Sequence, residues 1–266
     1  MSTIRVNGAQ LFYRSVGEGP ETIVFSHGYL MNHTMFNGQI ELLSKKYRCI
    51  SYEHRGHGFS EITQDGYSMD NLVADGIALI EALNLGPVHF VGMSTGGFVA
   101  MRIALRRPEL LKSIALISTS AEAESPKALK KNKLLMKVVR YLGWWPAISQ
   151  VQAMMFHTSF LQDENHQQEK QYWKSVLENQ NLKAMIAFGN AIFNRQSVLP
   201  DLARVSLPVA VVVGQQDVLT PQSCSENMVA SLQNATLHAI PEAGHCVAIE
   251  KAPEVAQILS NFYRQT

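Results

Sequence analysis

The sequence GMSTGG (residues 92–97) decides the fold, because it lies between a short apolar stretch, Val88–Val91, and a helix-like stretch, Thr95–Leu105. A G-x-S-x-G pattern at a strand-to-helix turn makes the chain reverse sharply and leaves the serine hydroxyl exposed above the strand. We therefore expect Ser94 to be a nucleophile at the carboxyl edge of a sheet. A dinucleotide-binding G-x-G-x-x-G turn fits poorly, since Ser94 occupies the second glycine position. A glycine-rich turn that serves packing alone is the other alternative.

Apolar, β-branched stretches alternate with amphipathic stretches on both sides of this motif. The predicted strands are Gln10–Ser15, Thr22–Ser26, Arg48–Tyr52, Val88–Val91, Ser113–Ile117, Val209–Val213 and Thr236–Ile240. The predicted helices are Met35–Leu43, Met69–Leu83, Thr95–Leu105, Gln222–Leu232 and Pro253–Tyr263. This alternation is typical of a mainly parallel sheet that is covered by helices on both faces.

The alternation stops between residues 122 and 197, where only helical patterns occur. The sequence therefore predicts a core formed by residues 1–121 and 198–266, with residues 122–197 inserted as a helical unit. Additional covering helices are the alternative. Large side chains are frequent in the insertion, and we expect some of them to line an apolar substrate pocket. The candidates are Trp144, Trp145, Met154, Phe156 and Phe188.

A basic segment begins the insertion. Its cations are Lys127, Lys130, Lys131, Lys133, Lys137 and Arg140, and its apolar stripe is Leu134, Leu135, Val138, Val139 and Leu142. The pattern predicts a solvated lysine face above a buried apolar face. Guidance of anionic substrates and loose contact with a membrane surface are the alternatives.

A serine hydroxyl needs a base, and the base needs an acid that orients it. In chain order the acid and then the histidine should follow the serine. Asp217 follows the predicted strand Val209–Val213, and His245 follows Thr236–Ile240. Because parallel strands bring such loops to one edge of the sheet, we expect Asp217 and His245 to complete a triad with Ser94. Glu122 and Glu124 are the alternative acids.

Two backbone N–H groups are expected to stabilise a developing oxyanion. One belongs to Thr95, directly after the serine, and the other to Tyr29, after His27-Gly28 at the end of a predicted strand. His27 is expected to hold this loop by a hydrogen bond. His54 and His57 could be proposed as metal ligands, but without a third ligand a structural role in their glycine-containing loop is the better interpretation.

These motifs resemble those of the α/β-hydrolase superfamily. The matching motifs are SHG (26–28), RGHG (55–58), GMSTGG (92–97), GQQD (214–217) and AGH (243–245), in the family's order. The chain is most similar to small esterases, 3-oxoadipate enol-lactonase and the cofactor-free haloperoxidases. Glu53 departs from the aspartate that usually precedes the arginine. The resemblance implies an α/β fold with a mostly parallel eight-stranded sheet and a helical cap that is inserted after the sixth strand and roofs the site.

Composition excludes several other classes. The chain has 266 residues, 46% of them hydrophobic, and a formal net charge of +1, so no global field favours nucleic acid. Its three cysteines are scattered and do not form a disulfide or metal pattern. We find neither a secretory signal pattern nor a run of about 18 apolar residues. We therefore expect a cytoplasmic monomer or homodimer without a membrane span.

The sequence thus predicts a serine hydrolase that cleaves a small carboxylic ester or lactone through an acyl-enzyme, with neither a cofactor nor a metal. Two alternatives use the same triad, namely perhydrolysis of the haloperoxidase type and hydrolysis of a carbon–carbon bond. A ligand receptor or signalling protein that turns over slowly is an alternative of another class.

Overall fold

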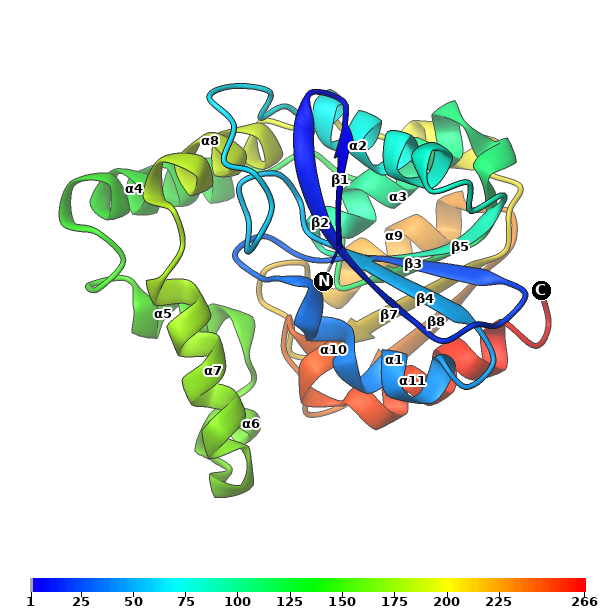
Figure 1. Cartoon of the computed structure of the whole chain (residues 1–266). Helices are drawn as coiled ribbons and strands as arrows, with labels where there is room; N and C mark the ends of the chain where they lie inside the picture. Colours follow the sequence, from blue (N-terminus) through cyan, green and yellow to red (C-terminus); the bar gives the residue numbers. More distant parts are fainter. Residues whose placement is uncertain (1) are drawn as a thin grey trace.

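The computed structural model of the chain describes residues 2–266, and its centre is one eight-stranded sheet (Figure 1). The strands are β1 (Ser2–Val6), β2 (Ala9–Val16), β3 (Thr22–Ser26), β4 (Arg48–Tyr52), β5 (Val88–Met93), β6 (Leu111–Ile117), β7 (Val209–Gly214) and β8 (Ala235–Ile240). Their order is β1-β2-β4-β3-β5-β6-β7-β8. β2 pairs antiparallel with β1 and β4, whereas the other neighbours pair in parallel. The predicted mostly parallel sheet is confirmed.

The central strands are apolar throughout because helices cover both faces of the sheet. Alternate residues of β3 belong to different cores: Ile23 and Phe25 lie on one face, and Val24 lies on the other. The first face is covered by α1 (Asn37–Leu43), α10 (Val247–Glu250) and α11 (Ala252–Phe262). The second face is covered by α2 (Met69–Ala82), α3 (Thr95–Arg106) and α9 (Gln222–Ser231).

The helical stretch between β6 and β7 projects to one side of this core (Figure 1). It contains α4 (Pro126–Leu142), α5 (Ile148–Met155), α6 (Thr158–Gln162), α7 (Gln167–Glu178) and α8 (Leu182–Phe193). The two ends of the stretch meet, because Val198 N–H donates to the Ala121 carbonyl (2.8 Å) and the Ser197 hydroxyl donates to the same oxygen (3.2 Å). The chain therefore leaves and re-enters the core at one point.

The strands bring their carboxyl ends to one edge of the sheet. Ser26 at the end of β3 lies opposite Gly92 of β5, and Gly214 at the end of β7 lies opposite Ile240 at the end of β8. The loops that carry the predicted site residues begin at these ends. Within residues 2–266, no helix is both long and apolar enough to cross a membrane.

Candidate active site

Ser94 occupies the turn between β5 and α3 in a strained backbone conformation, with φ +50° and ψ −110°. A non-glycine residue in this region of φ persists only where its surroundings hold it. Two hydrogen bonds do so: Ser94 N–H donates to the Ile117 carbonyl (2.9 Å), and the Ser94 carbonyl accepts from the Thr119 hydroxyl (2.7 Å). The end of β6, which is paired with β5, and the residues that follow it thus fix the turn.

Two glycines make this turn sterically possible. A Cβ atom on Gly92 would lie 2.2 Å from the Gly96 carbonyl oxygen, and one on Gly96 would lie 1.9 Å from the Ser26 carbonyl oxygen. Both contacts are with backbone, which cannot move away as a side chain could. The G-x-S-x-G pattern is therefore required by close backbone packing around the serine.

Asp217 and His245 form the second part of the site. The imidazole Nδ1 of His245 lies 3.0 Å from Oδ1 and 2.9 Å from Oδ2 of Asp217, and both side chains are buried. Asp217 Oδ1 also accepts from the backbone N–H groups of Leu219 (2.9 Å) and Thr220 (3.0 Å), while Oδ2 accepts from the Thr220 hydroxyl (2.8 Å). This arrangement fixes the orientation of the imidazole and directs Nδ1 toward the carboxylate.

The ionisation of Asp217 is favoured by its partners. Burial by itself raises the pKa of this carboxyl, but attraction to His245 and the hydrogen bonds from His245 and Thr220 outweigh burial, so the pKa lies below its ordinary value. Asp217 is therefore an anion near neutral pH. It can hold the imidazole in one tautomer and stabilise an imidazolium.

Ser94 and His245 line the same cavity, which has a volume of about 200 Å³. In this structure no hydrogen bond joins the Ser94 hydroxyl to the imidazole of His245 among the described residues. Such bonds are often long in enzymes without substrate and tighten when substrate binds. The cavity thus contains a hydroxyl and an imidazole that is oriented by a carboxylate, which are the groups needed for acyl transfer.

The loop after β3 places Tyr29 beside the serine. A Cβ atom on Gly28 would lie 3.4 Å from the Cβ of Ser94, so the backbone that enters Tyr29 passes close to the nucleophile. Within residues 2–266, the backbone N–H groups of Tyr29 and Thr95 have no protein hydrogen-bond acceptor. The Tyr29 ring stacks on Phe188, and its hydroxyl donates to the Met185 carbonyl (2.6 Å), which fixes the loop against α8.

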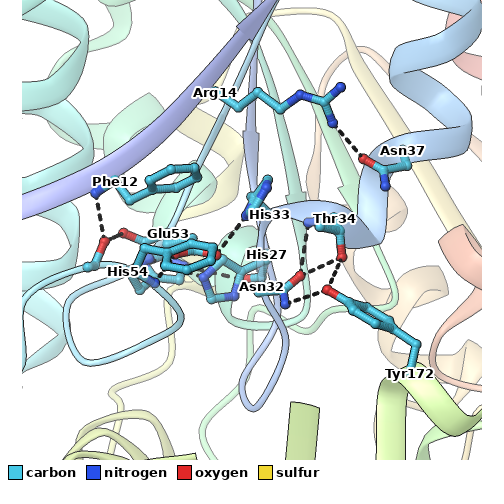
Figure 2. A network of polar contacts seen from close by, with 12 residues as sticks. Phe12, Arg14, His27, Asn32, His33, Thr34, Asn37, Glu53, His54 and Tyr172 are labelled. Carbon is cyan, nitrogen blue, oxygen red and sulfur yellow. Dashed lines mark hydrogen bonds and ion pairs between the residues drawn. The ribbon is translucent and has the colours of Figure 1, made fainter. Parts of the chain in front are cut away.

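A buried polar network lies under this loop (Figure 2). His27 Nδ1 donates to the Gly28 carbonyl (2.7 Å), and His27 Nε2 accepts from the backbone N–H of His54 (3.1 Å), as expected for a residue that holds the loop. Glu53 accepts from His33 Nδ1 (2.7 Å), so this carboxylate serves loop packing. Residues 2–266 contain no cluster of three or more histidine, cysteine or acidic side chains that could hold a metal ion.

The two alternative acids have other partners. Glu122 accepts from the Asn227 side-chain amide (3.0 Å), and Glu124 pairs with Arg195 (2.7 Å). Neither carboxylate forms a hydrogen bond with His245 in the described part of the chain. The geometry therefore favours Asp217 as the acid of this site.

The predicted pocket lining needs correction at four of five positions. Met154 lines the cavity, whereas Trp144, Trp145, Phe156 and Phe188 do not. Trp144 and Phe156 are buried in an apolar cluster that the insertion shares with one face of the sheet, and Phe188 packs against Tyr29 and His57. Trp145 is 86% exposed to solvent. Three of the four side chains are thus used in packing the insertion against the core, and the fourth faces solvent.

The actual lining includes residues that the sequence reasoning missed. The cavity is also bounded by Phe98, Ala128, Leu135, Ile192, Arg195 and Leu219. Arg195 is buried, pairs with Glu124, and lies over the Phe98 ring at 3.9 Å. No local sequence pattern predicts the Glu124–Arg195 pair, because the two residues are 71 positions apart.

Glu250 is a further missed residue near the site. Its carboxylate accepts from the backbone N–H of Gly244 (3.1 Å), directly before His245, and from the backbone N–H of His157 (2.8 Å). It therefore connects the histidine loop to the helical insertion. The only sequence feature that could have predicted a role for Glu250 is its position five residues after the A-G-H motif.

Comparison with known proteins places the chain in a family. A family model described as alpha/beta hydrolase fold matches residues 21–252. The 3-oxoadipate enol-lactonase 2 of Acinetobacter baylyi is 28% identical over 250 residues, which cover 94% of this chain and 91% of the relative. The crystal structure of the enol-lactonase from Burkholderia xenovorans LB400 superposes with a TM-score of 0.92 at 23% identity, covering 99% of this chain and 100% of that one. An esterase from Thermogutta terrifontis gives a TM-score of 0.92 at 24% identity and covers 100% and 99%.

The fold and the match over residues 21–252 define the class: the chain belongs to the alpha/beta hydrolase fold family. It is a hydrolase. The expected resemblance to enol-lactonases and esterases is confirmed.

Proposed function

We propose that the protein hydrolyses small carboxylic esters or lactones through a Ser94–His245–Asp217 triad. The observation that carries this proposal is one cavity that holds both the strained Ser94 turn and an imidazole bonded to a buried carboxylate. The named relative from A. baylyi, an enol-lactonase, supports the substrate class.

The proposed reaction has two halves. His245 takes the proton of the Ser94 hydroxyl as the oxygen attacks the carbonyl carbon, and the N–H groups of Tyr29 and Thr95 stabilise the resulting oxyanion. The imidazolium then protonates the leaving alcohol oxygen, which leaves an acyl group on Ser94. In the second half His245 activates water, which attacks the acyl carbon and releases the acid. In a lactone, the leaving alcohol and the acid belong to one product.

We further propose that residues 122–197 act as a cap over this site. Helix α4 contributes Ala128 and Leu135 to the cavity lining, and α5 contributes Met154. Residues of the insertion thus supply part of the surface that contacts an acyl chain or ring, together with Phe98 and Leu219 of the core, whereas the reacting groups come from the core loops alone. Changes in the insertion should therefore alter substrate choice without removing a reacting group.

Replacement of Ser94 tests the proposal. Ser94→Ala should lower kcat on p-nitrophenyl esters or small lactones by a factor on the order of 10⁴–10⁶ and abolish labelling by a serine-directed fluorophosphonate. Ser118→Ala is the matched control, because Ser118 is also buried, has a positive φ and directly follows the neighbouring strand β6, but does not line the cavity. Activity above a few per cent in pure, folded Ser94→Ala protein would remove Ser94 as nucleophile. Peroxide-dependent halogenation without esterase activity would favour the haloperoxidase alternative.

A further inference from the structure

Helix α4 presents one face to the cavity and the opposite face to solvent. Ala128, Asn132 and Leu135 line the cavity on one face. Lys130, Lys133, Leu134, Lys137 and Tyr141 recur on the opposite face, where all five are exposed. The expected burial of the apolar stripe is wrong for Leu134 and Leu142, which are 64% and 67% exposed. Leu134 points away from the cores because Met136 and Val139 fill the inward face, and Leu142 is the last residue of the helix.

The exposed apolar side chains form a group. Leu134, Tyr141, Leu142 and Trp145 are four of the nine large hydrophobic residues that are exposed in residues 2–266, and they lie within 12 positions. Tyr141 is 78% exposed, and Trp145 lies just beyond the helix. A concentration of exposed aliphatic and aromatic groups on one element marks an interaction surface. We call these four side chains, together with the surrounding cations, the α4 outer surface; its cations are Lys127, Lys130, Lys133, Lys137 and Arg140.

The charge on this surface is one-sided. Residues 125–162 contain five lysines and one arginine but neither aspartate nor glutamate. The rest of the chain has 17 basic and 22 acidic residues, a net charge of −5. The neighbouring helices do not neutralise the cations: α5 has no charged residue, and α8 adds Lys183. The whole chain therefore has a net charge near zero although helix α4 is strongly cationic.

We propose that the α4 outer surface docks on an anionic membrane surface, with the helix lying parallel to the bilayer. Lysine and arginine attract acidic headgroups, while leucine, tyrosine and tryptophan side chains insert at the boundary between headgroups and acyl chains. A single surface with both kinds of residue fits this partner. Docking leaves the cavity face of α4 unobstructed, since it is the opposite face.

Two other partners fit less well. A second copy of the chain would bring this cationic surface against itself in a two-fold dimer, so like charges would repel. Nucleic acid would use the cations for its phosphates, but the exposed leucines would have no role there. The apolar and cationic residues together favour the lipid surface.

Vesicle binding of the full chain tests the proposal. We expect co-sedimentation with vesicles of 30% phosphatidylglycerol and 70% phosphatidylcholine, weak binding to pure phosphatidylcholine, and loss of binding in 1 M salt, where the Debye length falls to about 3 Å. Trp144 and Trp173 are buried, so a blue shift of the emission on binding should come from Trp145 and disappear in Trp145→Ala.

Charge variants provide the matched comparison. Lys130→Gln/Lys137→Gln should weaken binding to the anionic vesicles by roughly 25-fold, about fivefold per cation. Lys45→Gln/Lys46→Gln changes the net charge equally at two exposed lysines outside α4, and it should bind nearly as the wild type does.

Several results would overturn the proposal. These are equal binding to neutral vesicles, equal effects of the two double variants, or DNA binding without vesicle binding. A dimer that Leu134→Gln dissociates, in the absence of vesicle binding, would assign the surface to a second copy. Binding requires no catalysis, so Ser94→Ala should bind vesicles as the wild type does. The outcome therefore does not depend on the proposed esterase activity.

Discussion

Three buried histidines under the nucleophile loop should make the fold labile to acid. His27, His54 and His57 are fully enclosed, and their rings lie within 6.3 Å of one another. Burial lowers the pKa of each imidazole; the pKa of His54 falls to about 3, and repulsion between the neighbouring imidazoles adds to the effect. His54 is therefore neutral in the folded protein at pH 5, and burial favours the neutral form of His27 and His57 as well.

The free-energy cost follows from proton linkage. Unfolded histidine titrates near pH 6.5, so below that pH the unfolded chain binds protons that the folded chain does not, and the free energy of unfolding falls. Between pH 7 and pH 5 the loss is about 2 kcal/mol for His54, and His27 and His57 act in the same direction. Against a total stability of about 5–15 kcal/mol, the loss from His54 alone is a sizeable fraction. A drop in Tm of at least roughly 4–8 °C should accompany it.

His57→Phe tests the calculation at one position. His57 Nε2 has no partner in the described structure, and its ring packs edge-on against Phe188 with centroids 4.5 Å apart, so phenylalanine preserves the aromatic contact. Urea unfolding at pH 7 and pH 5, at constant ionic strength, should give a smaller pH-dependent loss of stability in the variant than in the wild type. Any overpacking by phenylalanine cancels in this difference because it acts at both pH values. An unchanged pH dependence would refute the assignment of His57 as a neutral buried group.

Three further predictions concern the site itself. Asp217→Asn should lower kcat on a soluble ester by about 10⁴-fold, whereas Glu124→Gln should leave the triad intact. A larger loss of kcat in Glu124→Gln than in Asp217→Asn would show that Asp217 is not the acid of the triad. Burial raises the pKa of Glu250 above 4.5, so this carboxyl costs stability as pH rises; the Tm of Glu250→Gln relative to the wild type should increase from pH 4 to pH 7, and a decrease would contradict the direction of the shift. Leu135→Ala should enlarge the cavity and change the kcat/KM ratio of long to short acyl esters by roughly 10-fold, with Leu134→Ala, on the outer face, as the control.

The elements and the reacting groups were accessible from sequence because short-range rules determine them. Val88–Val91 and Thr95–Leu105 flank the serine, and parallel pairing then requires the loops after β5, β7 and β8 to meet at one edge. The structure accordingly places Asp217 against His245. The strands β5 and β7 run to Met93 and Gly214, slightly beyond their predicted ends, because their final residues still pair with neighbouring strands.

The residues that line the pocket could not be predicted from the sequence. The direction of a side chain in the helical insertion depends on which other elements each helix face packs against, and the sequence does not show these. Phe188 has the size and polarity expected of a pocket residue, but it is buried between Tyr29 and His57. The Glu124–Arg195 pair, which does line the cavity, joins two charged residues that the sequence separates by most of the insertion. The identity of a single apolar side chain does not show which residues it will contact in the folded protein.

Helix α4 shows why hydrophobic period alone gives the wrong assignment. A stripe at helical spacing identifies one apolar face, and the usual assumption is that this face is buried. In α4 apolar residues occupy two directions: Leu135 and Val139, one turn apart, face the core and the cavity, whereas Leu134 faces solvent. Folding explains the inward direction because Val139 is buried in the core and Leu135 packs against it. Folding does not explain the exposed Leu134, so the outward direction is the one that the proposed docking accounts for.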